Sequence, residues 1–388
     1  MRVLLDCRMA GWSGVGRYTT GLARALAARD DVELVQVCAA GAAPPVARGR
    51  GVEVVAAAAH PFGVRGAFEL GRLARKTKPD VVHCPHFPTP APVRGPLVVT
   101  LHDLTPLLVP GVMPSTARRA VYRAWNARAA RLAGRIIVPS RATAADVTRL
   151  FPAARGKLAV TAEAADDFAA GAAASLAGPL ADLVARPYVL AIGNTKPHKD
   201  LTTLLRALAQ MAPARPDLRL LLVGAEPPGY LGAPRAGAPP GAAPAAPPGV
   251  PPRVPLGVPP GVPPEVRARV VFTGRVTDTE LRTLYAGASA FVFPSRYEGF
   301  GLPPLEAMAL GVPVVCADAA SLPEVVGDAA LLFPPGDAAT LAAALSRVLD
   351  DPALRERLSQ AGRERATQFT WQRTAAATVA AYREALCP

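Results

Sequence analysis

Cysteine is scarce in this sequence, and long apolar runs are absent. The cysteines are odd in number and form no Cys-x-x-Cys pair, so the sequence predicts neither a disulfide framework nor a zinc site. No apolar run approaches the roughly 18–20 residues that cross a bilayer. The opening run is broken by Asp6 and Arg8, which is typical of a buried strand and not of a signal peptide. We expect a cytoplasmic protein and leave peripheral contact with the inner membrane face open.

Acidic residues are scarce in the first half of the chain. Residues 1–180 carry 23 Lys and Arg against 12 Asp and Glu, whereas residues 181–388 carry 20 against 18. This asymmetry predicts an anionic partner, such as a phosphorylated acceptor or an anionic membrane surface, and we predict no nucleic-acid partner. Arginines are concentrated in the stretch 116–135. They could form the surface that meets the anionic partner, or they could be the ordinary solvated face of a helix. Its arginines are Arg118, Arg119, Arg123, Arg128, Arg131 and Arg135.

Motifs for a metal ion are missing as well. No Asp-x-Asp pair occurs, and His83 and His86 have no acidic partner at metal-ligand spacing. We therefore predict no metal site and no cofactor. The two histidines are candidates for facing an acceptor.

The sequence does contain a repeated alternation of short apolar strands with helical segments, which is typical of a parallel sheet covered on both faces. The alternation pauses in a stretch of small residues at 168–178 and then restarts, so it predicts two doubly wound α/β domains. The predicted strands are Val3–Leu5, Leu34–Val37, Val81–His83, Leu97–Leu101, Ile136–Val138 and Leu158–Val160, then Tyr188–Gly193, Leu218–Val223, Val270–Phe272, Ala290–Phe293 and Val312–Ala317.

We place the N-terminal domain at 1–178, with a helix at 370–388 packing back on it, and the C-terminal domain at 186–369. Inside the second domain, residues 226–264 hold 15 prolines and 7 glycines in 39 residues, without hydrophobic periodicity. Such a composition cannot form a packed core, and it predicts a disordered or polyproline-like insertion.

The strongest motif is Glu298-Gly-Phe-Gly-Leu-Pro-Pro-Leu-Glu306, directly after the predicted strand 290–293. A strand, a glycine-rich turn and a helix beginning near Pro303 bring backbone N–H groups together at a helix N-terminus, which suits a nucleotide diphosphate. Glu298 precedes the turn and can reach towards a ligand. Glu306 lies about one turn into the helix, where it can accept hydrogen bonds from ribose hydroxyls. The alternative reading, a lone acid that offsets the helix dipole, does not account for two acids bracketing one turn.

A second polar segment, 193–199, follows the first strand of the second domain. Lys199 in this segment can place its ammonium on a phosphate, and we assign Asn194 and His198 to the same donor site. For Lys199 alone, a solvated surface lysine would be the ordinary alternative.

The first domain offers two weaker signals. Gly14 and Gly16 follow the first strand and open a helix, so their backbone can approach a diphosphate, although tight strand–helix packing explains such a pair equally well. His102 and Asp103 end the strand 97–101, where functional side chains emerge from such sheets. A histidine at a strand end is as often a structural hydrogen-bonding group.

The 298–306 segment resembles the signature of the retaining glycosyltransferases of family four, which have the GT-B fold. The resemblance includes Val271–Pro294 and Gly311–Pro335, and it covers most of residues 186–370. It implies two Rossmann-like, doubly wound domains that face each other across a cleft. The second domain would bind the nucleotide sugar and the first domain the acceptor, and transfer would be metal-independent.

The resemblance also implies roles for single residues. Glu298 would contact the donor sugar, Glu306 the ribose, and Lys199 the leaving nucleotide. His102 would contact the donor sugar near the reacting carbon. The family usually has Arg at the position of His198, and histidine does not supply a permanent charge. The backbone N–H groups offered to the diphosphate would be those of Phe300, Gly301 and Leu302.

The resemblance favours a mannosyltransferase-like member using GDP-mannose over a UDP-hexose, with a glycan, a lipid-linked sugar or a natural product as acceptor. Three other classes are weighed against it. A dinucleotide-dependent oxidoreductase would have a third glycine where Thr19 stands. A catalytically silent nucleotide or sugar-binding module would not need both glutamates and Lys199. A phosphorylase-like enzyme would need a pyridoxal lysine in a context that is not found.

Overall fold

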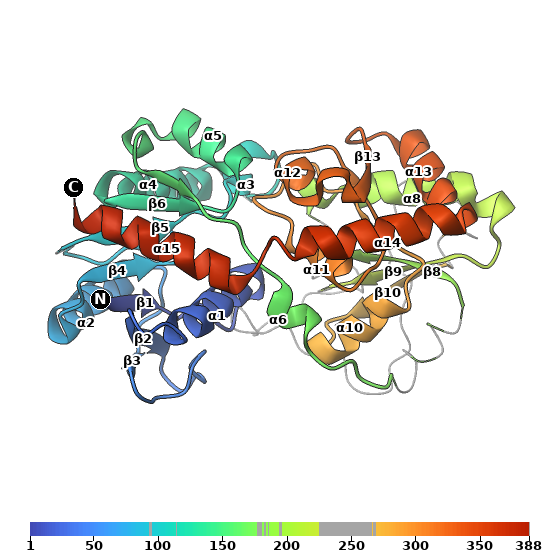
Figure 1. Ribbon diagram of the computed structural model, residues 1–388. Coiled ribbons are helices and arrows are strands. Elements are labelled where there is room, and N and C mark those ends of the chain that lie inside the picture. The colour runs from blue at the N-terminus through green and yellow to red at the C-terminus, as the bar shows by residue number, and fades with distance from the viewer. Residues whose placement is uncertain are drawn as a thin grey trace. The chain divides into compact units, whose positions relative to one another are not determined.

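The computed structural model describes residues 1–387, apart from 93–94, 114, 177–180, 182–183, 185, 194–195, 225–265 and 267–268. The predicted proline-rich insertion at 226–264 lies outside these described residues. The chain forms two compact units, both drawn in Figure 1. Unit 1 contains Met1–Asp167 and Phe369–Pro388, and unit 2 contains Phe168–Gln368.

Unit 1 is built on a seven-stranded sheet in which every neighbouring pair is parallel. Its strands are β1 (Arg2–Asp6), β2 (Glu33–Ala39), β3 (Val52–Ala57), β4 (Val81–Cys84), β5 (Leu97–Thr100), β6 (Arg135–Val138) and β7 (Leu158–Val160). The order β3-β2-β1-β4-β5-β6-β7 runs outward from β1 in both directions, which is the doubly wound arrangement.

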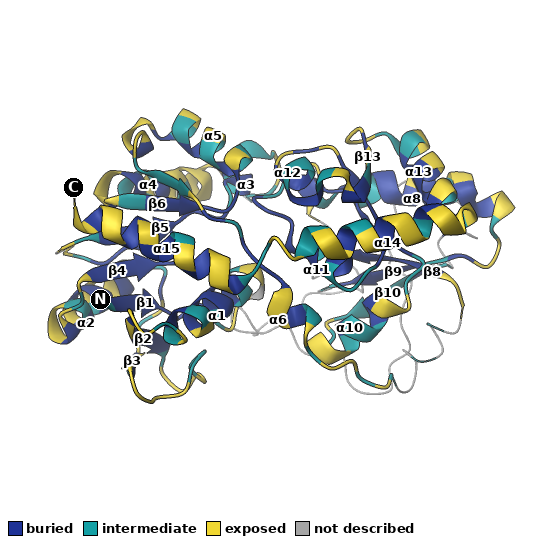
Figure 2. Ribbon diagram, in the orientation of Figure 1, coloured by how far each residue is buried: buried dark blue, intermediate teal, exposed yellow. Residues whose placement is uncertain are grey.

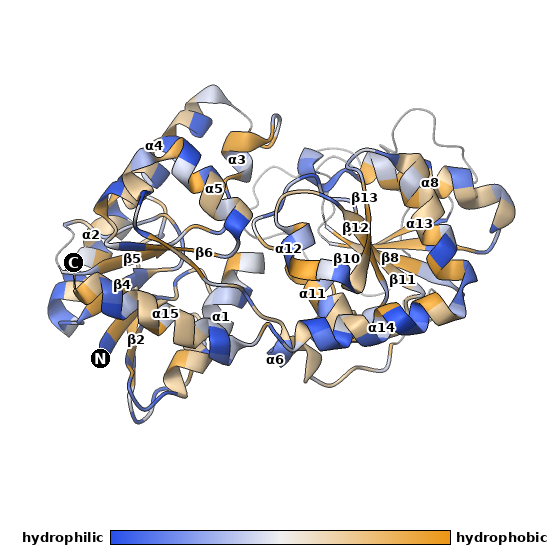
Figure 3. Cartoon of the chain, turned by 45° about the horizontal axis from the view of Figure 1, so that its top comes forward, coloured by the Kyte–Doolittle hydropathy of each residue, from blue (hydrophilic) through white to orange (hydrophobic). Residues whose placement is uncertain are grey.

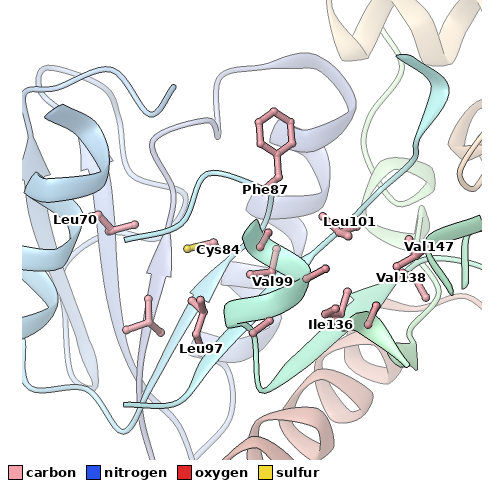
Figure 4. Close-up of a cluster of buried hydrophobic side chains, with 14 of the residues drawn as sticks. Leu70, Cys84, Phe87, Leu97, Val99, Leu101, Ile136, Val138 and Val147 are labelled. Carbon is pink, nitrogen blue, oxygen red and sulfur yellow. The ribbon is translucent and has the colours of Figure 1, made fainter. Parts of the chain in front are cut away.

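Two hydrophobic cores lie on opposite faces of this sheet, because successive strand residues point to opposite sides. Leu4 belongs to one core and its neighbours Val3 and Leu5 to the other. Helices α2 (Val64–Thr77), α4 (Thr116–Leu132) and α5 (Arg141–Leu150) contribute to the Leu4 core, part of which is shown in Figure 4. Helices α1 (Ser13–Ala27) and α15 (Trp371–Leu386) cover the other face. Two short elements, α3 (Thr105–Leu108) and η1 (Pro152–Ala154), complete the unit.

The C-terminal helix α15 packs directly on α1. A Cβ added at Gly21 would lie 2.1 Å from the Trp371 ring, so only glycine lets the two helices approach this closely. The Trp371 backbone N–H donates to Asp166 (3.0 Å) and its indole N–H donates to Asp167 (2.8 Å). These contacts place the last helix of the chain in the same core as the first.

Unit 2 contains a six-stranded parallel sheet whose order is β10-β9-β8-β11-β12-β13. Its strands are β8 (Tyr188–Ile192), β9 (Arg219–Val223), β10 (Val270–Gly274), β11 (Ala290–Phe293), β12 (Val314–Ala317) and β13 (Ala330–Phe333). Its main helices are α8 (Leu201–Met211), α10 (Asp278–Ala286), α11 (Leu302–Ala309), α12 (Leu322–Val326), α13 (Ala338–Asp350) and α14 (Pro352–Ala366). The short elements are α6 (Asp166–Ala169), which crosses from unit 1, η2 (Pro197–Lys199), η3 (Ala212–Ala214) and η4 (Gly327–Ala329).

Burial follows this layering in each unit. The strands are mostly buried and the outer faces of the helices exposed in Figure 2. In Figure 3 the strands of unit 2 are hydrophobic, whereas α14 is largely hydrophilic because much of its surface faces solvent. Among the described residues, no helix is both long and apolar enough to cross a membrane.

The two parallel sheets confirm the predicted pair of Rossmann-like domains. Two strands, β3 and β13, were not predicted from the sequence. The described part of the stretch 168–178, residues 168–176, which was predicted to end the first domain, belongs to unit 2. The Arg282 guanidinium of α10 donates to the carbonyl oxygens of Phe168 (2.6 Å) and Ala172 (2.9 Å), and its cation lies 4.9 Å from the Phe168 ring.

Candidate functional site

The predicted donor motif forms a tight turn between β11 and α11 in unit 2. Gly301 precedes the helix with φ +117°, a conformation that L side chains rarely adopt, and a Cβ there would lie 2.8 Å from Leu322. The Ser321 hydroxyl lies 3.0 Å from the Glu298 carbonyl oxygen and 2.6 Å from that of Phe300. The turn is therefore held from the side by the residue preceding α12.

The helix start that follows this turn has an unusual set of amides. Leu302 is the first residue of α11, and Pro303 and Pro304 come next and have no N–H to donate. The Leu305 N–H is bonded within the helix, to the Gly301 carbonyl oxygen (3.3 Å). Of the first three residues of α11, Leu302 alone therefore has an N–H group, so the predicted contact of an anion with this helix start depends on Leu302.

Lys199 and Glu298 form an ion pair at the carboxyl end of the sheet. Lys199 Nζ lies 2.6 Å from Glu298 Oε1, each side chain is 18% exposed, and the ammonium lies 4.9 Å from the Phe293 ring centroid. Two segments distant in sequence meet here because β8 and β11 are neighbours in the sheet. The structure thus brings together two residues that the sequence analysis assigned to catalysis.

A second ion pair lies beside the first and ties the same two segments together. The Arg296 guanidinium contacts Asp200 at 2.7 Å, and the Arg296 backbone N–H donates to the His198 carbonyl oxygen at 2.7 Å. His198 itself is only 8% exposed. Asn194, the remaining predicted residue of this segment, lies outside the described residues.

Glu306 is buried on α11 and its carboxylate is oriented by a tyrosine. The Tyr285 hydroxyl lies 3.1 Å from Glu306 Oε2 and 3.1 Å from the Pro303 carbonyl oxygen. Tyr285 comes from α10, so the sequence motif alone gave no sign of it. Tyr285 and Ser321 are the supporting residues that the sequence analysis missed in unit 2.

In unit 1, the two predicted glycines lie in the first turn of α1 and differ in their surroundings. A Cβ at Gly16 would lie 2.4 Å from the Ala10 carbonyl oxygen, whereas a Cβ at Gly14 would meet nothing within 4 Å. Gly16 is therefore needed for packing, and Gly14 leaves the helix start open.

His102 is held by two acceptors at the carboxyl end of β5. Its Nδ1 lies 2.8 Å from Glu163 Oε1, and its Nε2 lies 2.9 Å from the Pro85 carbonyl oxygen. A carboxylate and a carbonyl oxygen both accept hydrogen bonds, so this pair of partners favours the imidazolium form of the ring, in which both nitrogens donate. Burial alone would lower the pKa of His102, but the hydrogen bond and charge of Glu163, together with the Pro85 carbonyl and the charge of Asp103, raise it above 6.5.

Glu163 is the supporting residue that the sequence analysis missed in unit 1. It is 5% exposed and follows β7, so the sheet brings it next to His102 across 61 positions of sequence. The Tyr18 ring packs edge-on against His102 at 4.6 Å between centroids. The only sequence signal for Glu163 was its place after a strand end.

The other two histidines predicted in unit 1 do not form a metal-ligand pair. His83 lies 2.6 Å from the Tyr382 hydroxyl and 2.8 Å from the Thr100 hydroxyl, so both of its nitrogens are used inside the unit. Burial lowers the pKa of His83 and of His86 to about 3, which keeps both rings neutral. Within the part of the chain that the structure describes, no three His, Cys, Asp or Glu residues gather as a metal site requires.

The arginines of the predicted basic stretch do not form one continuous face. Arg119 donates to the Leu107 carbonyl oxygen, Arg128 donates to Thr89 and Pro90, and Arg135 pairs with Glu384 at 2.8 Å. These three side chains hold unit 1 together. Arg118, Arg119, Arg123 and Arg131 are exposed, and of these four only Arg119 has a hydrogen bond given above.

Comparison with known proteins identifies the class and then the family. The model described as "Glycosyltransferase Family 4" matches residues 12–167, and the model described as "Glycosyl transferases group 1" matches residues 265–365. Together with the two parallel sheets, these matches define a glycosyltransferase of the GT-B fold. The chain belongs to glycosyltransferase family four.

Relatives support this assignment at moderate identity. The chain is 29% identical to O-antigen chain mannosyltransferase B of Escherichia coli over 312 residues, 80% of this chain and 75% of that one. Sucrose-phosphate synthase from Thermosynechococcus elongatus shares its fold, with a TM-score of 0.72, 22% identity and coverage of 99% and 98%. Anabaena HepE in complex with UDP-glucose also shares the fold, with a TM-score of 0.63, 19% identity and coverage of 98% and 99%.

Proposed function

We propose that this protein is a retaining hexosyltransferase that transfers mannose from GDP-mannose to a glycan, lipid-linked or natural-product acceptor. The observation that carries the proposal is the Lys199–Glu298 pair at the end of β11, beside the glycine-rich turn. A relative named as an O-antigen chain mannosyltransferase supports mannose as the transferred sugar. The fold shared with HepE, whose structure contains UDP-glucose, supports a UDP-hexose as the second candidate donor.

The proposed donor site divides its work among charged side chains and backbone amides. Lys199 and the amides of the turn before α11 stabilise the charge that builds on the leaving diphosphate, the electrostatic contribution that is usually largest in such sites. Glu298 holds hydroxyls of the transferred sugar, and Glu306 accepts from the ribose. Because these groups of the protein stabilise the negative charge of the diphosphate, we propose that no metal ion is required.

The surroundings of two carboxylates near His102 support the part of the proposal that concerns mechanism, retention without a covalent intermediate. Glu163 is the buried carboxylate beside His102, and its Oε1 is engaged by the imidazolium, which makes it a poor nucleophile. Asp103 accepts from the Thr105 N–H at 2.8 Å. We therefore propose a same-face displacement, in which the leaving diphosphate takes the proton of the acceptor hydroxyl.

The test is a thermal-shift screen of GDP-mannose, UDP-glucose and NAD, followed by measurement of nucleotide release. Stabilisation by GDP-mannose and release of GDP support the proposal. Release of UDP from UDP-glucose alone would move the donor assignment to the second candidate. If a nucleotide sugar stabilises the protein but no nucleotide is released, with or without added acceptors, a catalytically silent binding module is favoured. Stabilisation by NAD alone would favour an oxidoreductase.

We further propose that the protein works in the cytoplasm and contacts anionic lipid through Arg118, Arg123 and Arg131 of α4. Each basic residue near such a surface contributes about 1 kcal/mol, so three support weak and reversible attachment. The protein should sediment with anionic liposomes and not with neutral ones, and about 1 M salt should release it. Sedimentation that survives replacement of all three arginines by glutamine would refute this contact.

A further inference from the structure

A row of aromatic rings runs along the carboxyl edge of the sheet in unit 1. Trp12 lies after β1, with its ring centroid 5.9 Å from that of His60 and 5.5 Å from that of Phe62, both between β3 and α2. Phe62 lies 5.8 Å from His86, which follows β4, and His86 lies 6.3 Å from His102, which follows β5. We call these five rings the aromatic row. It leads from an exposed side chain to the histidine assigned to the reacting carbon.

The outer end of the row is exposed and polar as well as aromatic. Trp12 is 44% exposed, and His60 is exposed beside it. His60 Nδ1 lies 3.2 Å from the Phe62 backbone nitrogen and 3.4 Å from the Phe62 carbonyl oxygen, so this nitrogen is engaged within the loop and Nε2 is the ring nitrogen left for a ligand. An indole face beside such a ring nitrogen is suited to a ligand with one apolar face and a rim of hydroxyls.

The inner end of the row is polar. His86 is uncharged at neutral pH, and its buried Nδ1 has no hydrogen-bond partner among the described residues. The next ring, His102, is fixed by Glu163 and Pro85. Three of the five rings are therefore histidines. A wall for an acyl or polyprenyl chain would instead be aliphatic.

We infer that the aromatic row is an acceptor subsite for a glycan of two or more sugars. The terminal sugar lies towards His86 and His102, and the preceding sugar stacks its C–H face on Trp12 and donates to or accepts from His60. The inference rests on the proposed function, in which unit 1 takes the acceptor. It goes further because it specifies an oligosaccharide acceptor, of which the aromatic row also binds a sugar other than the one that reacts.

The binding test uses the fluorescence of the protein, which does not depend on turnover. Of the three tryptophans, Trp12 is the most exposed, Trp125 is half-buried and Trp371 is buried. Disaccharides and trisaccharides of mannose, glucose and N-acetylglucosamine should change the emission of the wild type, and the monosaccharides should do so at least about tenfold more weakly. The change should vanish in Trp12→Phe. No response to any oligosaccharide would overturn the inference.

The kinetic test compares Trp12→Ala with a matched control, Phe68→Ala. Phe68 is 58% exposed on α2, and within the described part of the chain it takes part in none of the ring contacts above. Trp12→Ala should raise the KM for the best oligosaccharide acceptor about tenfold, and Trp12→Tyr should largely restore it. The KM for the donor and the slow hydrolysis of the donor in the absence of acceptor should not change.

Each outcome of these tests separates the subsite from the proposed function. Equal acceptor KM values in Trp12→Ala and Phe68→Ala would overturn the subsite while leaving the transferase intact. Fluorescence changes with oligosaccharides in a protein that releases no nucleotide would keep the subsite and refute the function. If vesicles of anionic lipid shift the Trp12 emission and the sugars do not, the row is a lipid contact and the inference is wrong.

Discussion

Replacing Glu163 by glutamine should change the protonation of His102 without removing its hydrogen-bonding neighbour. The hydrogen bond and charge of Glu163 are the main influences that raise the pKa of His102 against burial, whereas burial lowers the pKa of His83 and of His86 in the same unit to about 3. The introduced amide would be able to donate to a neutral His102 ring, so the fold should survive. We expect the pKa of His102 to fall below its ordinary value of 6.5 in Glu163→Gln.

The magnitude follows from the burial of the pair. The His102 and Glu163 side chains are 11% and 7% exposed, and removing one partner of a buried charged hydrogen bond costs about 2–3 kcal/mol. A raised pKa in the folded state stabilises the protein fully below pH 6.5, and this stabilisation is lost as pH rises through the raised value. The destabilisation by Glu163→Gln should therefore be largest near pH 6 and small near pH 9.

The assay is urea unfolding at pH 6 and pH 9, combined with NMR titration of the histidine side chains. The groups that face His102 are Glu163, Asp103, His83, His86 and Tyr18. Glu163→Gln could lower the free energy of unfolding equally at both pH values, or the His102 signal could titrate as in the wild type. Either result would refute the assignment of a positive charge to His102.

The control for this experiment is Glu69→Gln. The Glu69 carboxylate accepts from the backbone N–H groups of Ala58 and Ala59, and these bonds help to lower its pKa against the effect of burial. A lowered carboxyl pKa loses its stabilisation only as pH falls through that value, so Glu69→Gln should cost the same at pH 6 and pH 9.

Three further predictions follow from the same geometry. Glu306→Ala should weaken donor affinity about tenfold, whereas Glu298→Ala should mainly lower kcat. Calorimetry would measure donor affinity and initial rates would give kcat. An equal loss of donor affinity in both variants would show that these two roles are assigned wrongly. Activity should persist in EDTA, and loss that magnesium or manganese restores would refute metal-free transfer. Gly21→Ala should lower the free energy of unfolding by about 1–3 kcal/mol because its Cβ meets the Trp371 ring, whereas Gly14→Ala in the same helix should have little effect on denaturant unfolding.

Most of the strands that the sequence predicted are buried and have continuous apolar runs, although the edge strands β7 and β10 were predicted as well and are only partly buried. β3 escaped notice because it is an edge strand, most of whose residues are only partly buried. β13 is also an edge strand, and two of its four residues, Leu331 and Leu332, are not buried. In β3 the charged residue Glu53 interrupts the apolar run, whereas β13 is apolar throughout and its sequence does not explain why it was missed.

The site was predictable where a motif lies next to one strand end. Glu298, Gly301 and Glu306 share one short segment, and a motif carries all three. Glu163, Tyr285 and Ser321 act through hydrogen bonds across distant parts of the chain. No spacing in the sequence records those contacts, because they exist only once the sheets have formed.

Lys199 and Glu298 give the proposed donor site a built-in order of events. Their pair at 2.6 Å neutralises both charges before any ligand arrives. A diphosphate carries more negative charge than one carboxylate, so it should draw Lys199 away and leave Glu298 without its cation. The Glu298 carboxylate oxygens would then be able to accept hydrogen bonds from hydroxyl groups, just as the sugar attached to that diphosphate comes within reach. On the proposed function, a free sugar lacks the charge to separate the pair, and this favours the nucleotide-linked donor over the free hexose.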